Sequence, residues 1–277
     1  MPYKIYRAGG HILIEDGEQL YVSPQNDWDV FINRDDLHAQ ISRELPGLSP
    51  AANPDWSSLQ APIGTQEVWA AGVTYLRSKN ARMEESKESG GADFYDKVYE
   101  AERPEIFFKS VASRVIPSNG YVRIRKDSNW NVPEPELTLV VTSSGTIVGY
   151  TIGNDMSSRS IEGENPLYLP QAKVYDGSAA IGPCVLVTPE PPSMQTTIAM
   201  RILRNGQLAF EGATTTGQMK RRYTELVEFL YRELGFPAGA YLMTGTCVVP
   251  DADFTLMSGD VIRITIEGIG ELVNTVA

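Results

Sequence analysis

The sequence predicts a β-rich α+β fold, with a small N-terminal β-rich domain at residues 1–60 and a larger second domain at residues 61–277. Most of the chain divides into short apolar segments of strand length that are separated by Gly, Pro, Asn and Asp. A proline-rich stretch at residues 46–54 is typical of a linker. A chain of 277 residues can bury one large core and still support a small second domain.

Two strands and one helix are predicted for the first domain. Residues 11–14 and 19–22 are mostly apolar, and the turn between them contains Gly17, which is free to adopt a positive φ. The pattern therefore indicates a β-hairpin. A short helix is predicted over residues 34–45, before the linker.

The second domain begins with a predicted buried strand at residues 68–73 and continues with mostly β-type segments. A polar, mainly helical segment follows the first strand at residues 77–102, and Gly90-Gly91 interrupts it. This segment is either a lid over a pocket or a solvated pair of helices. Asn205-Gly206 predicts a hairpin, and leucines at positions 226, 230 and 234 predict a helix that ends at Gly235. The remaining predicted strands are residues 106–108, 121–125, 136–142, 146–152, 179–188, 198–204 and 207–210.

Composition excludes several classes of function. The formal net charge of −11 is the opposite of what a general nucleic-acid binder carries. No apolar run is long enough to span a bilayer and no signal-like segment follows Met1, so we expect a cytoplasmic protein without a membrane partner. Two cysteines are too few for a disulfide framework. His11 and His38 are the only histidines, which argues against a histidine-based catalytic pair or zinc site.

Two glutamates separated by one residue stand out at the start of the strand-like run 134–141. Alternate residues of a strand point to the same face with Cα atoms about 6.7 Å apart, so Glu134 and Glu136 can approach one point. Asp155, in a later turn, can complete a cage of oxygens for Mg²⁺, Mn²⁺ or Ca²⁺. The alternative is a solvated strand face. The apolar flank 137–141 favours the metal site, because buried carboxylates need a cation or a donor.

An ordered series of motifs between residues 68 and 277 resembles the fumarylacetoacetate hydrolase superfamily. The motifs lie at residues 104–110, 134–136, 149–159, 173–176, 182–183, 244–246, 258–261 and 266–270. The resemblance implies a mixed β-roll catalytic fold, Mg²⁺ held by Glu134, Glu136 and Asp155, and a homodimer or homotetramer. It also places Lys173 beside the substrate, where an ammonium can stabilise an enolate or transfer a proton.

Departures from the superfamily pattern indicate the reaction. Its hydrolases and decarboxylases usually have a histidine three residues after a tyrosine, and a glutamate three residues further on, to activate water. Here Tyr75 is followed by Ser78 and Ala81 at those places, and Ser160 stands where an aspartate is usual. Residues 75–86 and 160–173 instead look like the superfamily branch that dehydrates 2-keto-3-deoxy sugar acids. That likeness implies conversion of 2-keto-3-deoxy-D-arabinonate, which is the same compound as 2-keto-3-deoxy-D-xylonate, to 2,5-dioxopentanoate in non-phosphorylated pentose catabolism.

The remaining site predictions follow from this resemblance. Lys173, Glu84 and Glu85 are the expected proton-transfer residues, although the glutamates also fit a solvated helix face. The expected contacts to a 2-oxo acid substrate come from four residues: Arg82, Ser78, Lys109 and Thr246. Two alternatives stay open, a hydrolase that cleaves a carbon–carbon bond in an acylpyruvate or diketo sugar acid, and a non-catalytic metal-dependent binding protein.

Overall fold

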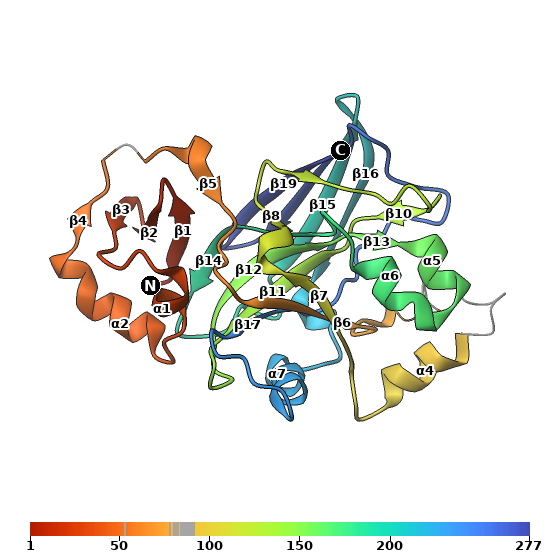
Figure 1. Cartoon of the computed structure of the whole chain (residues 1–277), viewed down its shortest axis with the longest axis horizontal. Coiled ribbons are helices and arrows are strands. Elements are labelled where there is room, and N and C mark those ends of the chain that lie inside the picture. The colour runs from red at the N-terminus through yellow and green to blue at the C-terminus, as the bar shows by residue number, and fades with distance from the viewer. Residues whose placement is uncertain (53, 78, 80–82, 84–91) are drawn as a thin grey trace.

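The computed structural model describes residues 1–52, 54–77, 79, 83 and 92–277. Its fold is β-rich and of the α+β class, as the sequence predicts, and Figure 1 shows the strands at the centre with helices at the periphery. The helices are α1 (Trp28–Ile32), α2 (Leu37–Glu44), α4 (Ala92–Glu100), α5 (Arg159–Glu164), α6 (Leu169–Lys173) and α7 (Tyr223–Tyr231). No helix in the described ranges combines the length and apolar character that crossing a membrane requires.

The strands form one long mixed sheet, a smaller sheet and a two-stranded ribbon. The long sheet has the order β4-β3-β2-β1-β14-β12-β11-β17-β6-β7, the smaller one has the order β16-β15-β18-β19-β9, and β10 pairs with β13. The strands are β1 (Tyr3–Ala8), β2 (His11–Asp16), β3 (Gln19–Val22), β4 (Ser49–Pro50), β5 (Leu59–Gln60), β6 (Glu67–Gly72), β7 (Glu105–Val111), β8 (Val115–Ile116), β9 (Tyr121–Val122), β10 (Asn131–Val132), β11 (Pro135–Val141), β12 (Ile147–Asp155), β13 (Ser157–Ser158), β14 (Ala179–Val187), β15 (Thr197–Arg204), β16 (Gln207–Thr215), β17 (Ala240–Met243), β18 (Val261–Ile266) and β19 (Gly270–Val276).

The N-terminal strands continue the long sheet. β1 pairs antiparallel with β2 on one side and with β14 on the other, where Tyr3 lies opposite Val187. In Figure 1, β14 extends from the main body toward the red N-terminal strands. A shared core packs here, with Ile5 and Phe31 in the same cluster as Val140 and Tyr241. The division of the chain at about residue 60 stays a prediction.

A second core lies between the long sheet and the smaller one. Leu139 and Ile152 of the long sheet pack in one cluster with Met200 and Ile264 of the smaller sheet and with Leu226 of α7. The strands alternate between buried and more exposed side chains in β18, as expected for a sheet with one buried face. Burial of this apolar surface fixes β11 and β12 in place, and both strands lead to the site described below.

Most predicted elements are present, with different ends. The hairpins around Gly17 and Asn205-Gly206 are confirmed as β2–β3 and β15–β16. The helix expected at 34–45 is present as α2, which begins at Leu37 rather than Arg34. The sequence analysis did not predict α1, which the Asp27 side chain caps by accepting from two backbone N–H groups. The strand expected at 121–125 ends at Val122.

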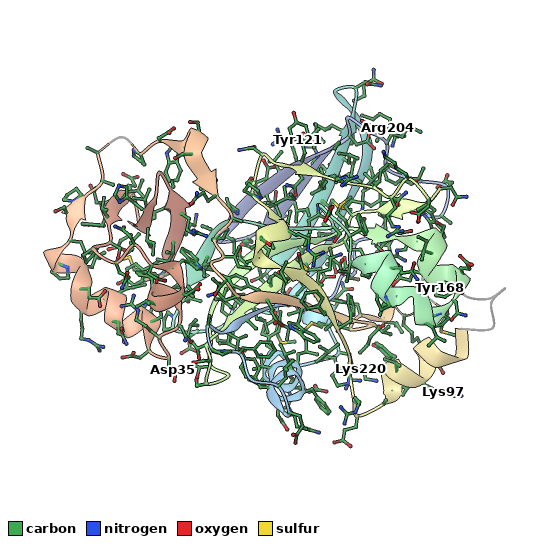
Figure 2. All side chains as sticks on the ribbon, viewed as in Figure 1. Asp35, Lys97, Tyr121, Tyr168, Arg204 and Lys220 are labelled. Atoms are coloured by element: carbon green, nitrogen blue, oxygen red, sulfur yellow. The ribbon has the colours of Figure 1, made fainter. Side chains whose placement is uncertain are left out.

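Helix α4 covers part of the segment predicted to be helical at 77–102. Arg221 donates to the carbonyl oxygens of Val98, Ala101 and Glu102, and Lys220 donates to that of Tyr99 at 2.6 Å. These bonds satisfy carbonyls at the end of α4 and attach it to the segment before α7. Figure 2 labels Lys97 and Lys220 at this edge of the molecule.

Candidate metal centre and active site

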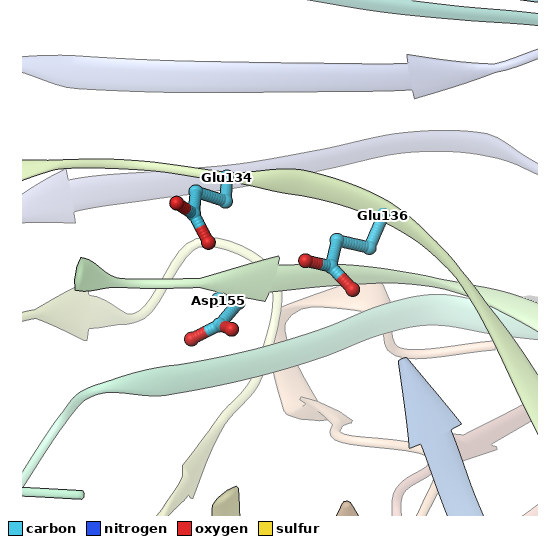
Figure 3. Close-up of side chains that lie close together, drawn as sticks. All are labelled: Glu134, Glu136 and Asp155. Atoms are coloured by element: carbon cyan, nitrogen blue, oxygen red, sulfur yellow. The ribbon is translucent and has the colours of Figure 1, made fainter. Parts of the chain in front are cut away.

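Three carboxylates meet where β11 begins and β12 ends. The two strands are antiparallel, with Glu136 opposite Gly153, and the Asp155 N–H donates to the Glu134 carbonyl at 3.0 Å. Oxygens of Glu134, Glu136 and Asp155 lie within 4.8 Å of one another, and Figure 3 shows the three side chains directed to a common point. The predicted convergence of these carboxylates is therefore confirmed, and it follows from strand alternation together with hairpin register.

Burial makes this group of acids energetically costly without a cation. Glu136 is 2 % exposed, and burial raises its pKa well above the ordinary range, with repulsion from Asp155 and Glu134 raising it further. The Gly245 N–H donates to Glu136 Oε2 at 2.6 Å. In the described part of the structure no cationic side chain pairs with Glu136, so the carboxylate depends on that N–H and on whatever cation the cluster binds.

Gly245 is required at this place for two reasons. Its φ is +96°, a conformation that residues with a side chain rarely adopt. A Cβ would also lie 2.0 Å from Thr74 Oγ1 and 3.0 Å from the Ala71 carbonyl oxygen. The glycine thus lets the backbone N–H approach Glu136.

Three buried cationic side chains surround the other two carboxylates. Lys173 Nζ contacts Glu134 and lies 3.1 Å from Asp155 Oδ2. Arg159 Nη2 lies 2.5 Å from Glu134 Oε1, and Lys109 Nζ lies 2.5 Å from Asp155 Oδ1. Two of the acids therefore hold the Lys173 ammonium at the carboxylate cluster, and its predicted place beside the substrate stays a prediction.

Lys109 also binds the backbone around the carboxylates. Its ammonium also donates to the carbonyl oxygens of Met156 at 2.9 Å and of Lys173 at 2.5 Å. Burial lowers its pKa, and attraction to Asp155 opposes that shift. Lys109 is absent from the residues that line the cavity beside the carboxylates, and its role in substrate binding stays a prediction.

A small cavity opens beside the three acids. The residues lining it are Ala71, Gly72, Val73, Phe107, Glu134, Glu136, Asp155, Arg159, Lys173, Gly245 and Thr246. Thr246, a predicted substrate-binding residue, is thus at the cavity wall. Val73 has a φ of 54°, a strained conformation for a β-branched residue and one that is often found at functional sites.

Four predicted site residues lie outside the described residues. They are Ser78, Arg82, Glu84 and Glu85. The sequence analysis gave no role to Arg159, although this residue follows Asp155 by four positions in the motif at residues 149–159. The proximity of this arginine in sequence to a predicted carboxylate ligand could have indicated its role, because buried carboxylates need cationic or hydrogen-bonding partners.

The donor set fits a divalent cation. Carboxylate oxygens are the ligands that Mg²⁺ prefers, at about 2.0–2.1 Å, so two ligands on opposite sides of the ion lie about 4.2 Å apart. The 4.8 Å limit on the oxygens of Glu134, Glu136 and Asp155 is close to this spacing. Three protein ligands leave positions for a chelating substrate, and we propose these residues as the ligands.

Comparison with known proteins agrees with this geometry. The sequence model described as Fumarylacetoacetate (FAA) hydrolase C-terminal matches residues 68–277. The chain belongs to the fumarylacetoacetate hydrolase family. It is 51 % identical over 219 residues to a probable 2-keto-3-deoxyxylonate dehydratase of Haloferax volcanii, and 42 % identical over 219 residues to the 2-dehydro-3-deoxy-D-arabinonate dehydratase of Saccharolobus solfataricus. Each match covers 78 % of this chain and 73 % of the relative.

A solved structure shows the same fold over the full length. It is a 2-keto-3-deoxy-D-arabinonate dehydratase in complex with magnesium and 2,5-dioxopentanoate, with a TM-score of 0.82 and 31 % sequence identity. The comparison covers 100 % of this chain and 98 % of that one. A fumarylacetoacetate hydrolase from Exiguobacterium antarcticum, at 22 % identity and a TM-score of 0.71, shares the fold.

Proposed function

We propose that this protein dehydrates 2-keto-3-deoxy-D-arabinonate to 2,5-dioxopentanoate. The observation that carries the proposal is the buried triad Glu134, Glu136 and Asp155 with Lys173 against two of its members, in a chain 42 % and 51 % identical to two dehydratases of this kind of substrate. The magnesium and the product in the similar solved structure support the same substrate and cofactor. The protein is thus a hydro-lyase of pentose catabolism that uses magnesium.

The side chains of the site fit elimination of water. A divalent cation bound by the three carboxylates would polarise the 2-oxo group of the substrate and make the C3 protons more acidic. Lys173 supplies a positive charge and a transferable proton next to the ligands. Arg159 and Lys109 hold Glu134 and Asp155 in place, and Thr246 offers a hydroxyl at the cavity wall.

The positions of the histidines argue against water-activating hydrolysis. His11 lies on β2, and the His38 ring contacts the Met1 carbonyl oxygen at 2.8 Å. Neither residue lines the cavity beside the carboxylates. An elimination needs no activated water, which agrees with this arrangement.

We also propose that the chain assembles as a homodimer or homotetramer. The smaller sheet ends in β16 on one side and β9 on the other, and both edges carry exposed apolar side chains, with Leu208 51 % and Tyr121 66 % exposed. Figure 2 shows Tyr121 at the surface. Unpaired strand edges of this kind favour contacts with another chain. Light scattering coupled to size-exclusion chromatography measures the assembly directly, and a monomer at micromolar concentration would contradict it.

A substrate panel tests the function. Purified protein with Mg²⁺ is incubated separately with 2-keto-3-deoxy-D-arabinonate, a six-carbon 2-keto-3-deoxy aldonate and an acylpyruvate, and products are identified by NMR. We expect 2,5-dioxopentanoate from the first compound and no cleavage of the acylpyruvate. Hydrolysis of the acylpyruvate without dehydration of the sugar acid would refute the proposal.

A further inference from the structure

The peptide unit between Thr244 and Gly245 makes a hydrogen bond at each of its two ends. Its N–H, on Gly245, donates to Glu136 Oε2 at 2.6 Å. Its carbonyl oxygen, on Thr244, accepts from the Thr74 hydroxyl at 2.7 Å. Because this peptide is planar and trans, its N–H and its C=O point in opposite directions, and the two hydrogen bonds together fix its rotation. The direction of the N–H toward Glu136 therefore depends on the contact with Thr74.

Further hydrogen bonds fix the residues on both sides of this contact. Thr244 donates its N–H and its hydroxyl to the Leu137 carbonyl oxygen of β11, at 3.0 and 2.8 Å. The Thr74 carbonyl oxygen accepts from the Lys220 N–H at 2.9 Å. A Cβ on Gly245 would lie 2.0 Å from Thr74 Oγ1, so the hydroxyl packs directly on the glycine. Thr74 and Thr244 are both fully buried, and solvent does not reach the hydrogen bond between them.

Glu136 relies on the Gly245 N–H because its partners differ from those of the other two carboxylates. Glu134 and Asp155 each contact two cationic side chains. Over the residues that the structure describes, Glu136 pairs with no cationic side chain and accepts from the Gly245 N–H. A rotation of the peptide that carries this N–H would change the position of the Glu136 carboxylate. One of the three oxygen ligands offered to a divalent cation would then move.

We propose that Thr74 is a positioning residue of the metal centre, and that its hydroxyl directs the Gly245 N–H to Glu136. The inference rests on the metal centre of the proposed function. Donation to the Thr244 carbonyl also polarises the peptide and strengthens its N–H as a donor, because linked hydrogen bonds reinforce one another. Thr74 is not among the residues that line the cavity, so it acts on a bound cation through the peptide and Glu136.

Two substitutions of Thr74 and one matched control test the role of its hydroxyl. Thr74→Val keeps the shape of the side chain but removes the hydroxyl, whereas Thr74→Ser keeps the hydroxyl. Thr151→Val is the control, because Thr151 on β12 is also fully buried and its hydroxyl donates to the Cys184 carbonyl oxygen at the same distance of 2.7 Å. Thr151 does not line the cavity. Each variant is measured for Mg²⁺ affinity by calorimetry, for the Tm of the metal-free protein, and for dehydration as a function of Mg²⁺ concentration.

We expect Thr74→Val to weaken Mg²⁺ binding by about tenfold or more, because residues that orient metal ligands contribute about 10-fold to 100-fold to affinity. Thr74→Ser should stay within about threefold of the wild type, and Thr151→Val should bind Mg²⁺ as the wild type does. Both valine variants lose one buried hydrogen bond and should lower the metal-free Tm by a similar amount, about 2–6 °C. Thr74→Val should need about tenfold more Mg²⁺ for half-maximal turnover.

Wild-type Mg²⁺ affinity in Thr74→Val, with the Tm lowered as in Thr151→Val, would make Thr74 an ordinary buried threonine and overturn the inference. An equal loss of Mg²⁺ affinity in Thr151→Val would overturn it as well. If Thr74→Val does not fold, Thr74→Ser and Thr74→Ala give the same comparison, because both lack the methyl group and only the serine has a hydroxyl. Equal Mg²⁺ affinity in that pair would contradict the role of Thr74. A wild-type protein that binds no Mg²⁺ would instead refute the metal centre itself.

Discussion

Replacing Lys109 with methionine tests whether this residue stabilises the folded protein or binds the substrate. The Lys109 ammonium lies 2.5 Å from Asp155 Oδ1 and donates to the Met156 and Lys173 carbonyls at 2.9 and 2.5 Å. Methionine has a similar volume and none of these donors. Losing one partner of a buried ion pair costs about 3–5 kcal/mol, and a buried carbonyl left without a donor costs about 1 kcal/mol or more.

The expected loss of unfolding free energy for Lys109→Met is about 4 kcal/mol, because Asp155 keeps Lys173 at 3.1 Å as a second partner. For a chain of this size, about 2–4 °C of Tm is lost per kcal/mol, so the expected fall in Tm is about 8–16 °C. Thermal unfolding followed by near-ultraviolet circular dichroism measures it. Lys126→Met, at an exposed lysine, is the control and should stay within about 2 °C. A Tm unchanged by Lys109→Met together with a KM raised more than about tenfold would refute the stabilising role of Lys109. It would support the substrate contact that the sequence predicts.

Three further predictions concern the site. The pKa of Glu136 is raised in the folded protein, so at pH values above about 4.5 the native state binds more protons than the unfolded chain. The stability of metal-free protein therefore falls as the pH rises from about 4.5 toward the pKa of Glu136 in the folded state. Metal-free Glu136→Gln should lose that pH dependence in thermal melts while binding Mg²⁺ more weakly; an identical pH profile would contradict this. Lys173→Met should lower kcat by about 100-fold with a much smaller change in KM and with Mg²⁺ affinity retained, whereas a rise in KM alone would make Lys173 only a binding residue. The double variant His11→Gln and His38→Gln should keep kcat within about threefold, because loss of a true general base costs about 100-fold; a loss that large in folded protein would restore the hydrolase alternative.

Local patterns explain what could be predicted from the sequence. The alternation of a strand places Glu134 and Glu136 on one face, and the β11–β12 hairpin brings Asp155 opposite Glu134. Both facts depend on residues close in sequence. The hairpin at Asn205-Gly206 follows in the same way from turn chemistry.

Long-range contacts explain what could not be predicted. Tyr3 pairs with Val187, so the place of the N-terminal strands in the long sheet depends on a partner far along the chain. Lys109 contacts Asp155 although β11, β17 and β6 lie between β7 and β12 in the order of the long sheet, and no local pattern separates such a structural residue from a substrate ligand. The strand predicted through Arg125 stops at Val122, and Arg125 instead pairs with Asp127 in the loop that follows.

The central claim is that the protein eliminates water from a five-carbon 2-oxo acid at the Glu134, Glu136 and Asp155 site. The most direct measurement is a ¹³C NMR time course with uniformly labelled 2-keto-3-deoxy-D-arabinonate, in the presence of Mg²⁺ and after exhaustive chelation. We predict a single five-carbon product with a 2-oxo group and a C5 aldehyde or its hydrate, formed only when Mg²⁺ is present. Separate pyruvate and glycolaldehyde signals, or undiminished turnover after chelation, would contradict the account.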